Sequence, residues 1–471
     1  MDEGRPPDPE PSASPDPTEE VDPADVEPIE PRAPGRGIVA IVGVLVVALV
    51  VFAIVGGRII TAAPAQTTAQ PPRLAVTDRD GKLHTMDASG GSVTDFGASG
   101  VQFGFPTWSP DGTRIAVTGK DKDSTAIYVF DAGTASAKPA IVYDSAAVPP
   151  FYAYWSPDGG HIAFLAQKPD KIALQVVPAD GSAKVATVRE GAPLYWDWLG
   201  SDHLVAHIGL AGSEGSFLGE VDLKGTSSET EPLTAGSFRS PAVSHDRAFR
   251  AYVTSGQQAA GMVTVESADR ASRQTTEVFG VAAVSFDPAG QTLAFVGAKQ
   301  PLANDPGFPL GPLKAIDPRN GQTRTLLDGD VVGFFWAPDG RTIAALTIAP
   351  VEDQPVGVVG LPGARLASAR GPAPGAEPRS TAEGVPLTLA FVDVASGALR
   401  AQRPAEVTST FVNNILPYFD QYALSHRMWA PDSSAIALPL VKDGSDQLFV
   451  IKPDGSEPVP LKGAQLGFWS P

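Results

Sequence analysis

The sequence predicts an all-β fold, a ring of about eight short four-stranded sheets, from three observations. The 471 residues include 48 Gly and 46 Pro, which suits many short strands joined by turns. One phrase recurs at a spacing of roughly 42 to 50 residues, a period typical of small sheets repeated around a centre. The two ends of the repeating region carry complementary halves of that phrase.

Residues 1–36 come first and are crowded with Pro, Asp and Glu. They hold too few large apolar side chains to offset the entropy cost of ordering the chain, so we expect a disordered acidic tail. Residues 37–57 follow, and their uncharged run from Ile38 to Val55 would be about 27 Å long as a helix, close to the thickness of a bilayer. This run predicts one transmembrane helix.

Three arginines flank this run, Arg32 and Arg36 before it and Arg58 after it. The excess of positive charge before the run favours a cytoplasmic amino terminus. The acidic leader and the length of the apolar run favour an uncleaved anchor. We therefore expect a single-pass membrane protein in which residues 58–72 form a flexible stalk and residues 73–471 lie outside the cytoplasm.

The repeated phrase combines an aromatic residue, a turn and an apolar strand, as in WSPDGTRIAV and WSPDGGHIAF. Strong copies begin at Trp108, Trp155, Phe286, Trp336 and Trp429, and weaker copies begin at Trp198 and Val243. So many copies at a regular spacing indicate one kind of sheet repeated around a ring.

Each letter of the phrase has a structural reason. In Ser-Pro-Asp-Gly, Ser suits the first position of a type I turn, Pro fixes the backbone of the second, and Gly suits the fourth. After the turn, Ile115 and Val117 alternate with Arg114 and Ala116, which is the period of a strand with two different faces. We expect the Trp before the turn to pack between neighbouring sheets.

The first and last parts of the repeating region complement one another. RLAVT at Arg73 matches RIAVT at Arg114, but no aromatic phrase precedes it. The missing piece stands at the other end, where AQLGFWSP supplies the aromatic phrase at Trp469 with nothing after it. We therefore expect residues 73–76 to pair with the carboxyl-terminal strand, which removes exposed sheet edges.

The copies, together with the shared one at Trp469, predict eight sheets, and seven is the alternative because two copies are weak. The interval between Trp336 and Trp429 is the longest. It contains a stretch rich in Pro, Gly and Ala, residues 350–385, which predicts a mobile inserted loop.

WSPDG followed by IAF, with a DRDG turn and a strand such as AIYVFD, resembles the WD40-like (PD40-type) repeats of TolB-type β-propellers. The resemblance covers residues 73–471. It implies a bacterial β-propeller of six to eight blades, commonly extracytoplasmic, that binds other proteins at its faces. TolB itself carries an α/β domain before its propeller, whereas only the stalk precedes Arg73 here, so partnership with a peptidoglycan-associated lipoprotein is not implied.

No catalytic or metal-binding motif stands out in the repeats. Similar propellers precede the hydrolase domain of prolyl-oligopeptidase-type peptidases, but the nearest string to a nucleophile elbow, AGSEG around Ser213, lacks its first Gly. His203 and His207 have zincin spacing, yet on a strand they would lie roughly 13 Å apart, too far to share a zinc ion. The DRDG loop at Asp78 has Ser89 where a calcium loop needs Glu. We expect no catalytic residue, no metal and no cofactor.

The segment from Phe411 to Asp432 is the richest in polar and aromatic side chains. It lies between the inserted loop and an inner strand, and the inner strands of a propeller line its central channel, where ligands bind. The candidate ligand-binding residues are Asn414, Asp420, Gln421, His426 and Arg427. The alternative is a loop whose polar groups cap neighbouring blades.

The net charge of the chain excludes one class of binding partner. A net charge of −18 would repel phosphate backbones, so we expect no nucleic acid partner. The sequence predicts a non-enzymatic extracytoplasmic scaffold that binds an envelope protein, a peptide or a glycan at the mouth of the channel. The alternative is a lyase or glycoside hydrolase that uses channel-facing carboxylates or His426. The sequence does not predict an oligomeric state.

Overall fold

The computed structural model describes residues 71–471, except for 211–212, 214, 228–232, 258–259, 303–305 and 349–383. Residues 71–471 form one unit of the chain. The tail expected at 1–36, the helix expected at 37–57 and most of the stalk expected at 58–72 lie outside the described residues. So does the inserted loop expected at 350–385, except for its last two residues.

The predicted localisation needs a correction. Over the residues that the structure describes, no helix is long and apolar enough to cross a bilayer. The two α-helices there have six and seven residues, about 10 Å at 1.5 Å per residue, against roughly 30 Å of hydrocarbon. This finding contradicts the prediction of a single-pass membrane protein with an extracytoplasmic propeller.

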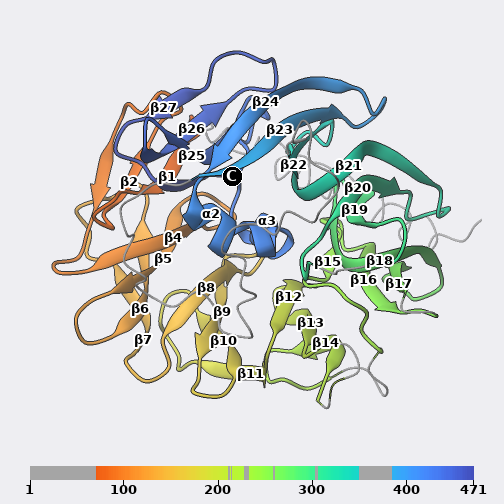
Figure 1. Cartoon of the computed structure of the whole chain (residues 1–471). Coiled ribbons are helices and arrows are strands. Elements are labelled where there is room, and N and C mark those ends of the chain that lie inside the picture. Colours follow the sequence, from red (N-terminus) through yellow and green to blue (C-terminus); the bar gives the residue numbers. More distant parts are fainter. Residues whose placement is uncertain are drawn as a thin grey trace, which may run out of the picture. The chain divides into compact units, whose positions relative to one another are not determined.

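The described strands form antiparallel groups around a common centre (Figure 1). Four groups are separate sheets, and four are consecutive parts of one 13-stranded sheet, divided at β18, β21 and β24. Group 1 contains β28 (Leu466–Trp469), β1 (Leu74–Thr77), β2 (Leu83–Met86) and β3 (Thr94–Phe96). Group 2 contains β4 (Gln102–Trp108), β5 (Arg114–Lys120), β6 (Thr125–Asp131) and β7 (Ala140–Ser145). Group 3 contains β8 (Pro150–Trp155), β9 (His161–Gln167), β10 (Ile172–Pro178) and β11 (Ala186–Gly191).

The remaining groups follow in chain order. Group 4 contains β12 (Leu194–Trp198), β13 (His203–Ile208) and β14 (Phe217–Asp222). Group 5 contains β15 (Ala242–Val243), β16 (Phe249–Ser255), β17 (Gly261–Ser267) and the first part of β18 (Arg273–Phe286). Group 6 contains the rest of β18, β19 (Leu293–Ala298), β20 (Gly311–Ile316) and the first part of β21 (Thr323–Trp336). Group 7 contains the rest of β21, β22 (Thr342–Ile348), β23 (Val385–Asp393) and β24 (Leu399–Val407). Group 8 contains β25 (Ile436–Lys442), β26 (Ser445–Ile451) and β27 (Val459–Leu461).

Every copy of the repeated phrase, strong or weak, supplies the first position of one group. In groups 1 to 7 the aromatic or apolar residue of the phrase ends the first strand, as Trp155 ends β8. In group 8 the first position is a single bridge between Trp429 and Ile436. The fold is therefore all-β and propeller-like, as the repeats predict.

The two ends of the repeating region pair as expected. β28 lies antiparallel to β1, with Leu74 opposite Trp469 and Val76 opposite Gly467. The backbone N–H of Ser470 donates to the carbonyl of Arg73 at 2.8 Å. The carboxyl-terminal strand thus supplies the first strand of group 1.

The Ser-Pro-Asp-Gly segments form the predicted turns. The N–H of Gly112 donates to the carbonyl of Ser109 at 2.9 Å, and Gly112 has a φ of 70°, which Gly adopts without strain. The Ser109 hydroxyl donates to the Asp111 carboxylate at 2.6 Å. Ser156 and Asp158 repeat this bond at 2.6 Å. Both the backbone hydrogen bond and the Ser–Asp side-chain bond therefore stabilise the turn.

The turns alternate between two ends of the ring because neighbouring strands are antiparallel. One end carries the turns that follow the repeated residue in groups 2 to 8, such as the Ser-Pro-Asp-Gly turns of groups 2 and 3, and we call it the turn end. The opposite end carries the connections between the second and third strands and those between groups. A helical segment between β24 and Trp429 enters there, so we call this the insert end.

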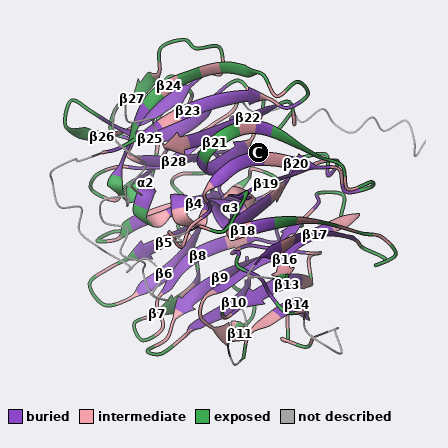
Figure 2. Cartoon of the chain, turned by 45° about the vertical axis from the view of Figure 1, so that its right-hand side comes forward, coloured by how far each residue is buried: buried purple, intermediate pink, exposed green. Residues whose placement is uncertain are grey.

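The repeated Trp joins neighbouring groups, as expected. The indole N–H of Trp155 donates at 3.2 Å to the carbonyl of Thr107, the residue just before the repeated Trp of the preceding group. Equivalent bonds join Trp108 to Phe468 at 3.1 Å, Trp336 to Ser285 at 3.1 Å, and Trp429 to Phe335 at 3.0 Å. We call these four bonds the Trp ladder. Buried residues run along the strands of the groups (Figure 2).

The Trp ladder is missing between groups 3 and 4 and between groups 4 and 5. Among the described residues the indole N–H of Trp198 has no acceptor, and group 5 has Val243 in place of Trp. The Asp197 carboxylate instead accepts from the Tyr154 hydroxyl of group 3 at 3.0 Å and from the Val243 N–H of group 5 at 2.7 Å. Burial raises the pKa of Asp197 to about 7, against the lowering effect of these donors. One buried carboxyl group thus joins three groups.

Candidate functional site

A short helical insert lies at the centre of the ring (Figure 1). It consists of α2 (Ser409–Asn414), the 3-10 helix η1 (Leu416–Tyr418) and α3 (Phe419–Ser425). α3 contacts β8, β12, β18 and β21, which belong to the inner strands of four groups. The insert therefore lies across the channel at the insert end.

The sequence analysis did not predict these helices, although their signals are present. The Thr408 hydroxyl caps α2 by accepting from the N–H of Phe411 at 3.3 Å, and Pro417 stands in the first turn of η1. Phe411, Ile415 and Phe419 recur every four residues and are fully buried. This spacing is that of one apolar helix face.

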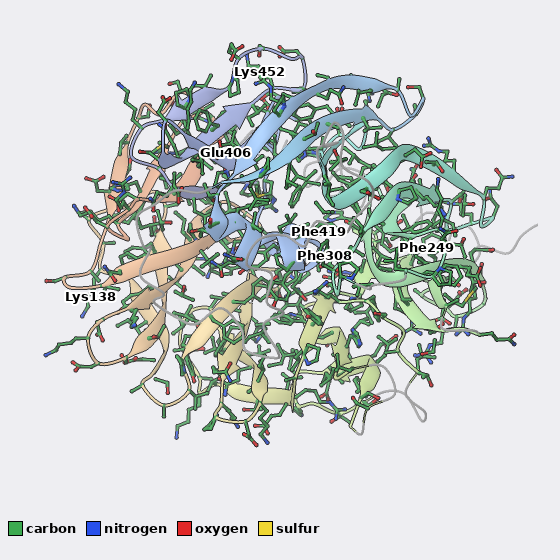
Figure 3. The ribbon with its side chains drawn as sticks, in the orientation of Figure 1. Lys138, Phe249, Phe308, Glu406, Phe419 and Lys452 are labelled. Carbon is green, nitrogen blue, oxygen red and sulfur yellow. The ribbon has the colours of Figure 1, made fainter. Side chains whose placement is uncertain are left out.

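The apolar side of the insert packs on group 7. The ring of Phe419, which Figure 3 shows at the centre, meets those of Phe334 and Phe335 edge to face, with centroids 5.2 and 6.0 Å apart. Gly333 allows this approach, since a Cβ there would lie 2.8 Å from the Leu416 side chain. The insert is thus held as part of the core.

The polar side of the insert bonds to groups 3, 4 and 5. The Gln421 amide accepts from the N–H of Trp196 at 3.0 Å and donates to its carbonyl at 2.8 Å and to the Tyr152 hydroxyl at 3.2 Å. The Asp420 carboxylate accepts from the N–H of Ser240 at 3.2 Å. Burial raises the pKa of Asp420 to about 6, although the positive charge of Arg239 opposes this. These bonds fasten the insert to the strands around it.

Ser425 and His426 follow in a buried network. The Ser425 hydroxyl lies 2.7 Å from the Tyr152 hydroxyl and 2.6 Å from Nδ1 of His426. The Thr107 hydroxyl donates to the carbonyl of Ser425 at 2.7 Å. Burial lowers the pKa of His426 to about 3, so its ring is neutral at pH 7. The pair has the groups of a nucleophile and a base, but His426 is only 1% exposed, which leaves no path for a substrate in this structure.

The structure brings three of the five predicted ligand-binding residues together inside the ring. Asp420, Gln421 and His426 are buried, and the first two bond to neighbouring strands, as the capping alternative describes. Asn414 ends α2 and is partly exposed. Arg427 follows His426 and is also partly exposed. Ligand binding by these five residues stays a prediction.

One cluster beside the insert was missed by the sequence analysis. The Arg239 guanidinium lies 5.4 Å from the centre of the Tyr418 ring and donates to the carbonyl of Gly307 at 2.9 Å. The Tyr418 ring lies 6.4 Å from that of Tyr195. Arg239 and Tyr418 are both partly exposed. We call Arg239, Tyr195 and Tyr418 the Arg239 cluster. Arg239 lies outside every copy of the repeated phrase, so the sequence carried no signal for it.

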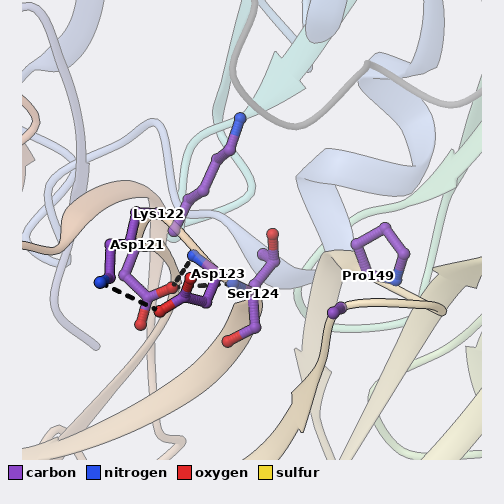
Figure 4. Close-up of a pocket in the computed structure, with 8 residues that line it drawn as sticks. Asp121, Lys122, Asp123, Ser124 and Pro149 are labelled. Atoms are coloured by element: carbon purple, nitrogen blue, oxygen red, sulfur yellow. Dashed lines mark hydrogen bonds and ion pairs between the residues drawn. The ribbon is translucent and has the colours of Figure 1, made fainter.

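A shallow pocket lies at the β5–β6 hairpin, also at the insert end (Figure 4). Its lining comes from Lys120, Asp121, Lys122, Asp123, Ser124, Thr125, Ala146 and Pro149. The Asp121 carboxylate accepts from the N–H groups of Asp123 and Ser124, both at 2.8 Å, which is the chemistry of a tight turn. Within the described ranges, no group of three or more His, Asp or Glu side chains could hold a metal ion.

No protein-family model and no curated protein matches the sequence. Among solved structures, the fold is similar to TolB from Acinetobacter baumannii, with 12% identity and a TM-score of 0.37 over 85% of this chain and 66% of that chain. A putative TolB from Agrobacterium tumefaciens is similar at 13% identity and a TM-score of 0.36, over 81% and 98% of the two chains. A prolyl endopeptidase is similar at 10% identity and a TM-score of 0.48, over 78% of this chain and 50% of that one. The chain thus spans about two thirds of the first TolB and half of the endopeptidase.

Proposed function

We propose that this protein is an eight-bladed, TolB-like β-propeller that acts as a non-enzymatic scaffold and binds a protein partner at the insert end. The observation that carries the proposal is the Arg239 cluster. Arg and Tyr are the side chains that most often anchor protein interfaces, because they bury a large area and keep a polar end. In this cluster they are partly exposed and already held in place by Gly307 and Tyr195.

The geometry of the insert supports the same function. α3 lies across the channel. The polar side-chain atoms of Gln421 and Asp420 form hydrogen bonds with Trp196 and Ser240. The surface left for recognition is therefore the outward side of the insert and the connections around it. Pre-organised side chains on a rigid core bind with little loss of conformational entropy, which favours a scaffold.

The test uses the full-length chain as bait in a lysate of its own source, with Tyr418→Ala as the site variant and Arg341→Ala as the control. Arg341 is exposed at the turn end, away from the insert. A captured protein is then purified, and its affinity for each bait is measured directly. We expect Tyr418→Ala to weaken binding at least tenfold, about 1.4 kcal/mol, and Arg341→Ala to leave it unchanged.

Two results would contradict the proposal. Equal affinity of a purified partner for both variants would place recognition elsewhere on the molecule. Turnover of a substrate that is lost in His426→Ala, with folding unchanged, would favour the lyase or glycoside-hydrolase alternative, in which a buried imidazole becomes reachable.

A further inference from the structure

Two partly exposed arginines at the insert end hold their guanidinium groups over aromatic rings. Arg189, near the end of β11, lies over the Phe217 ring of β14, 4.7 Å from the ring centre. Arg239 lies over the Tyr418 ring, 5.4 Å from its centre. Among the described residues neither guanidinium forms an ion pair with a carboxylate, and Nε of Arg189 and Nη1 of Arg239 have no acceptor. Both side chains are therefore positively charged donors that are held in place without an acidic partner.

Both arginines lie beside the same hairpin, which belongs to group 4 (Figure 1). β13 and β14 are joined at the insert end, where Ile208 pairs with Phe217. Arg189 contacts this hairpin through the Phe217 ring. Arg239 is bound to it through the backbone, because its carbonyl accepts from Nδ1 of His207 in β13 at 2.8 Å. The hairpin thus brings an arginine of group 3 and an arginine that precedes group 5 to one part of the insert end.

An exposed apolar side chain belongs to the same hairpin. Leu210 follows β13 by two residues and is 66% exposed, more than any other large apolar side chain that the structure describes. A single exposed leucine is ordinary on a protein surface, but this one accompanies two fixed cations. Removing it from water would favour binding of a partner that also satisfies the arginines.

Two carboxylates close to these arginines are already engaged. Glu190 follows Arg189 in the sequence and pairs with Lys168 and with Lys171, the second at 2.5 Å. The Asp420 carboxylate is buried, and its two oxygens accept from backbone N–H groups at 3.2 and 3.0 Å. The two guanidinium charges are therefore left for a partner, although the chain as a whole has a net charge of −18.

A guanidinium recognises a carboxylate well, because its fork of N–H donors matches the two oxygens. A guanidinium that is already fixed also loses little conformational entropy on binding. We propose that the partner docks through an acidic segment that places one carboxylate on Arg189, a second on Arg239 and an apolar side chain on Leu210. This inference rests on the proposed function, because Arg239 belongs to both surfaces, and it adds the chemistry of the partner.

The experiment titrates the full-length protein with fluorescein-labelled peptide amides and follows fluorescence anisotropy at constant ionic strength. The acidic probes contain two glutamates separated by two, four or six residues, of which two are leucines and the rest glycines. Matched probes carry Gln in place of Glu, or Ser in place of Leu. We expect the best acidic probe to bind saturably, at least about tenfold tighter than its Gln form and about threefold tighter than its Ser form.

Variants assign the contacts to residues. We expect Arg189→Gln and Arg239→Gln each to weaken binding of the acidic probe at least about fivefold, and Leu210→Ser to weaken it about threefold. Arg341→Gln, at the turn end, should match the unmodified protein. Equal binding of the acidic probe and its Gln form would overturn the proposal. Unchanged binding by Arg189→Gln, or no saturable binding of any acidic probe, would overturn it as well.

A second measurement does not depend on how the variants fold. Phenylglyoxal modifies accessible arginines, and peptide mapping by mass spectrometry locates each modified residue. We expect both Arg189 and Arg239 of the unmodified protein to react at least threefold more slowly with the acidic probe present, and its Gln form to give no protection. Equal reaction rates of Arg189 with and without the acidic probe would contradict the proposal.

Failure of this inference and failure of the proposed function give different results. Weaker binding of the captured partner to Tyr418→Ala, with no binding of any acidic probe, would keep the interface at the insert end and exclude an acidic partner. Loss of the acidic probe in Arg189→Gln, with equal affinity of the captured partner for Tyr418→Ala and the unmodified protein, would keep the acid-binding surface and exclude the proposed interface.

Discussion

The two sides of the ring join their neighbouring groups by different means. Between groups 1, 2 and 3, and again between groups 6, 7 and 8, an indole N–H reaches one fixed carbonyl of the preceding group, as Trp155 reaches Thr107. Between groups 3, 4 and 5 that bond is missing, and the Asp197 carboxylate links Tyr154 to Val243. The side with the Trp ladder repeats the same indole–carbonyl hydrogen bond, whereas groups 3 to 5 are joined by the buried carboxyl group of Asp197.

The side chains of the insert bond mainly to the side without the Trp ladder, and one further bond joins Thr107 of group 2 to the carbonyl of Ser425. Gln421 bonds to Trp196 of group 4 and to Tyr152 of group 3, and Asp420 bonds to Ser240 of group 5. The opposite side of the insert makes apolar contacts with group 7. Where the repeat is degenerate, a segment from far along the chain supplies the missing connections. Weak copies therefore mark the place where the insert is fastened.

Breaking the acid-linked side should have the largest effect. In Asp197→Ala, the Val243 N–H and the Tyr154 hydroxyl lose their acceptor in a buried site, so we expect the free energy of unfolding to fall by about 3–4 kcal/mol. Urea denaturation of the full-length protein at pH 6 measures it. Asp158→Ala, in an exposed part of a turn on the ladder side, serves as the control and should cost less than half as much. A loss below 1 kcal/mol for Asp197→Ala would contradict this role.

Detaching the insert from the same side comes next. Gln421→Leu keeps most of the side-chain volume but leaves the N–H and the carbonyl of Trp196 without their buried partner. We expect a loss of about 2–3 kcal/mol in the free energy of unfolding. Gln322→Leu, at an exposed turn of group 6, should change it by less than about 0.5 kcal/mol. Equal effects of the two substitutions would mean that the amide does not hold the insert.

The free energy of unfolding should change with pH in opposite directions for the buried acid Asp197 and for the turn carboxylates of the ladder side. The pKa of Asp197 is about 7 in the folded protein and 3.8 without its surroundings, so the folded state holds the proton more strongly. Between pH 4 and 7 the folded chain binds more protons than the unfolded chain, and the free energy of unfolding falls as pH rises. We expect a fall of about 2 kcal/mol from pH 5 to 7 that is absent in Asp197→Asn. Asp420, with a pKa of about 6, adds in the same direction below pH 6.

Turn carboxylates on the ladder side should show the opposite sign. Although burial opposes it, the Ser156 hydroxyl and the Gly160 N–H lower the pKa of Asp158. Its contribution to stability is therefore present above its ordinary pKa and is lost as the pH falls through the folded value. Subtracting the pH profile of Asp158→Asn from that of the unmodified protein isolates it. A stability difference that grows toward low pH would contradict the assignment.

The sequence predicted the parts of the fold that rest on local chemistry. The turn at Ser109, the strand that follows Arg114, and the pairing of Leu74 with Trp469 each depend on residues that recur or complement one another. The inter-group packing of Trp155 was predicted for the same reason. A contact that is repeated in several groups requires the same residue type at the same position of each repeat, so a single sequence suffices to find it.

The centre of the ring was harder to predict. The sequence analysis predicted a ligand-binding segment there, with a capping loop as the alternative, and no helix. Polar side chains such as Asn414 and His426 mask the four-residue apolar spacing from Phe411 to Phe419. The Arg239 cluster forms only when three distant segments meet, and no local pattern marks it. Asp197 stands inside a weak copy, where its acceptor role depends on Tyr154 and Val243 from other groups.

The smallest expected effect tests the Trp ladder itself. Trp155→Phe keeps an aromatic ring between groups but removes the N–H that donates to Thr107 at 3.2 Å. Trp198→Phe makes the same change where no such bond exists. The two substitutions lose similar apolar volume, so their difference reports the hydrogen bond, and we expect Trp155→Phe to cost about 1 kcal/mol more. Equal losses of unfolding free energy in matched urea titrations would mean that packing of the aromatic rings alone joins the groups. The indole bonds that are missing between groups 3 and 4 and between groups 4 and 5 would then need no replacement by Asp197.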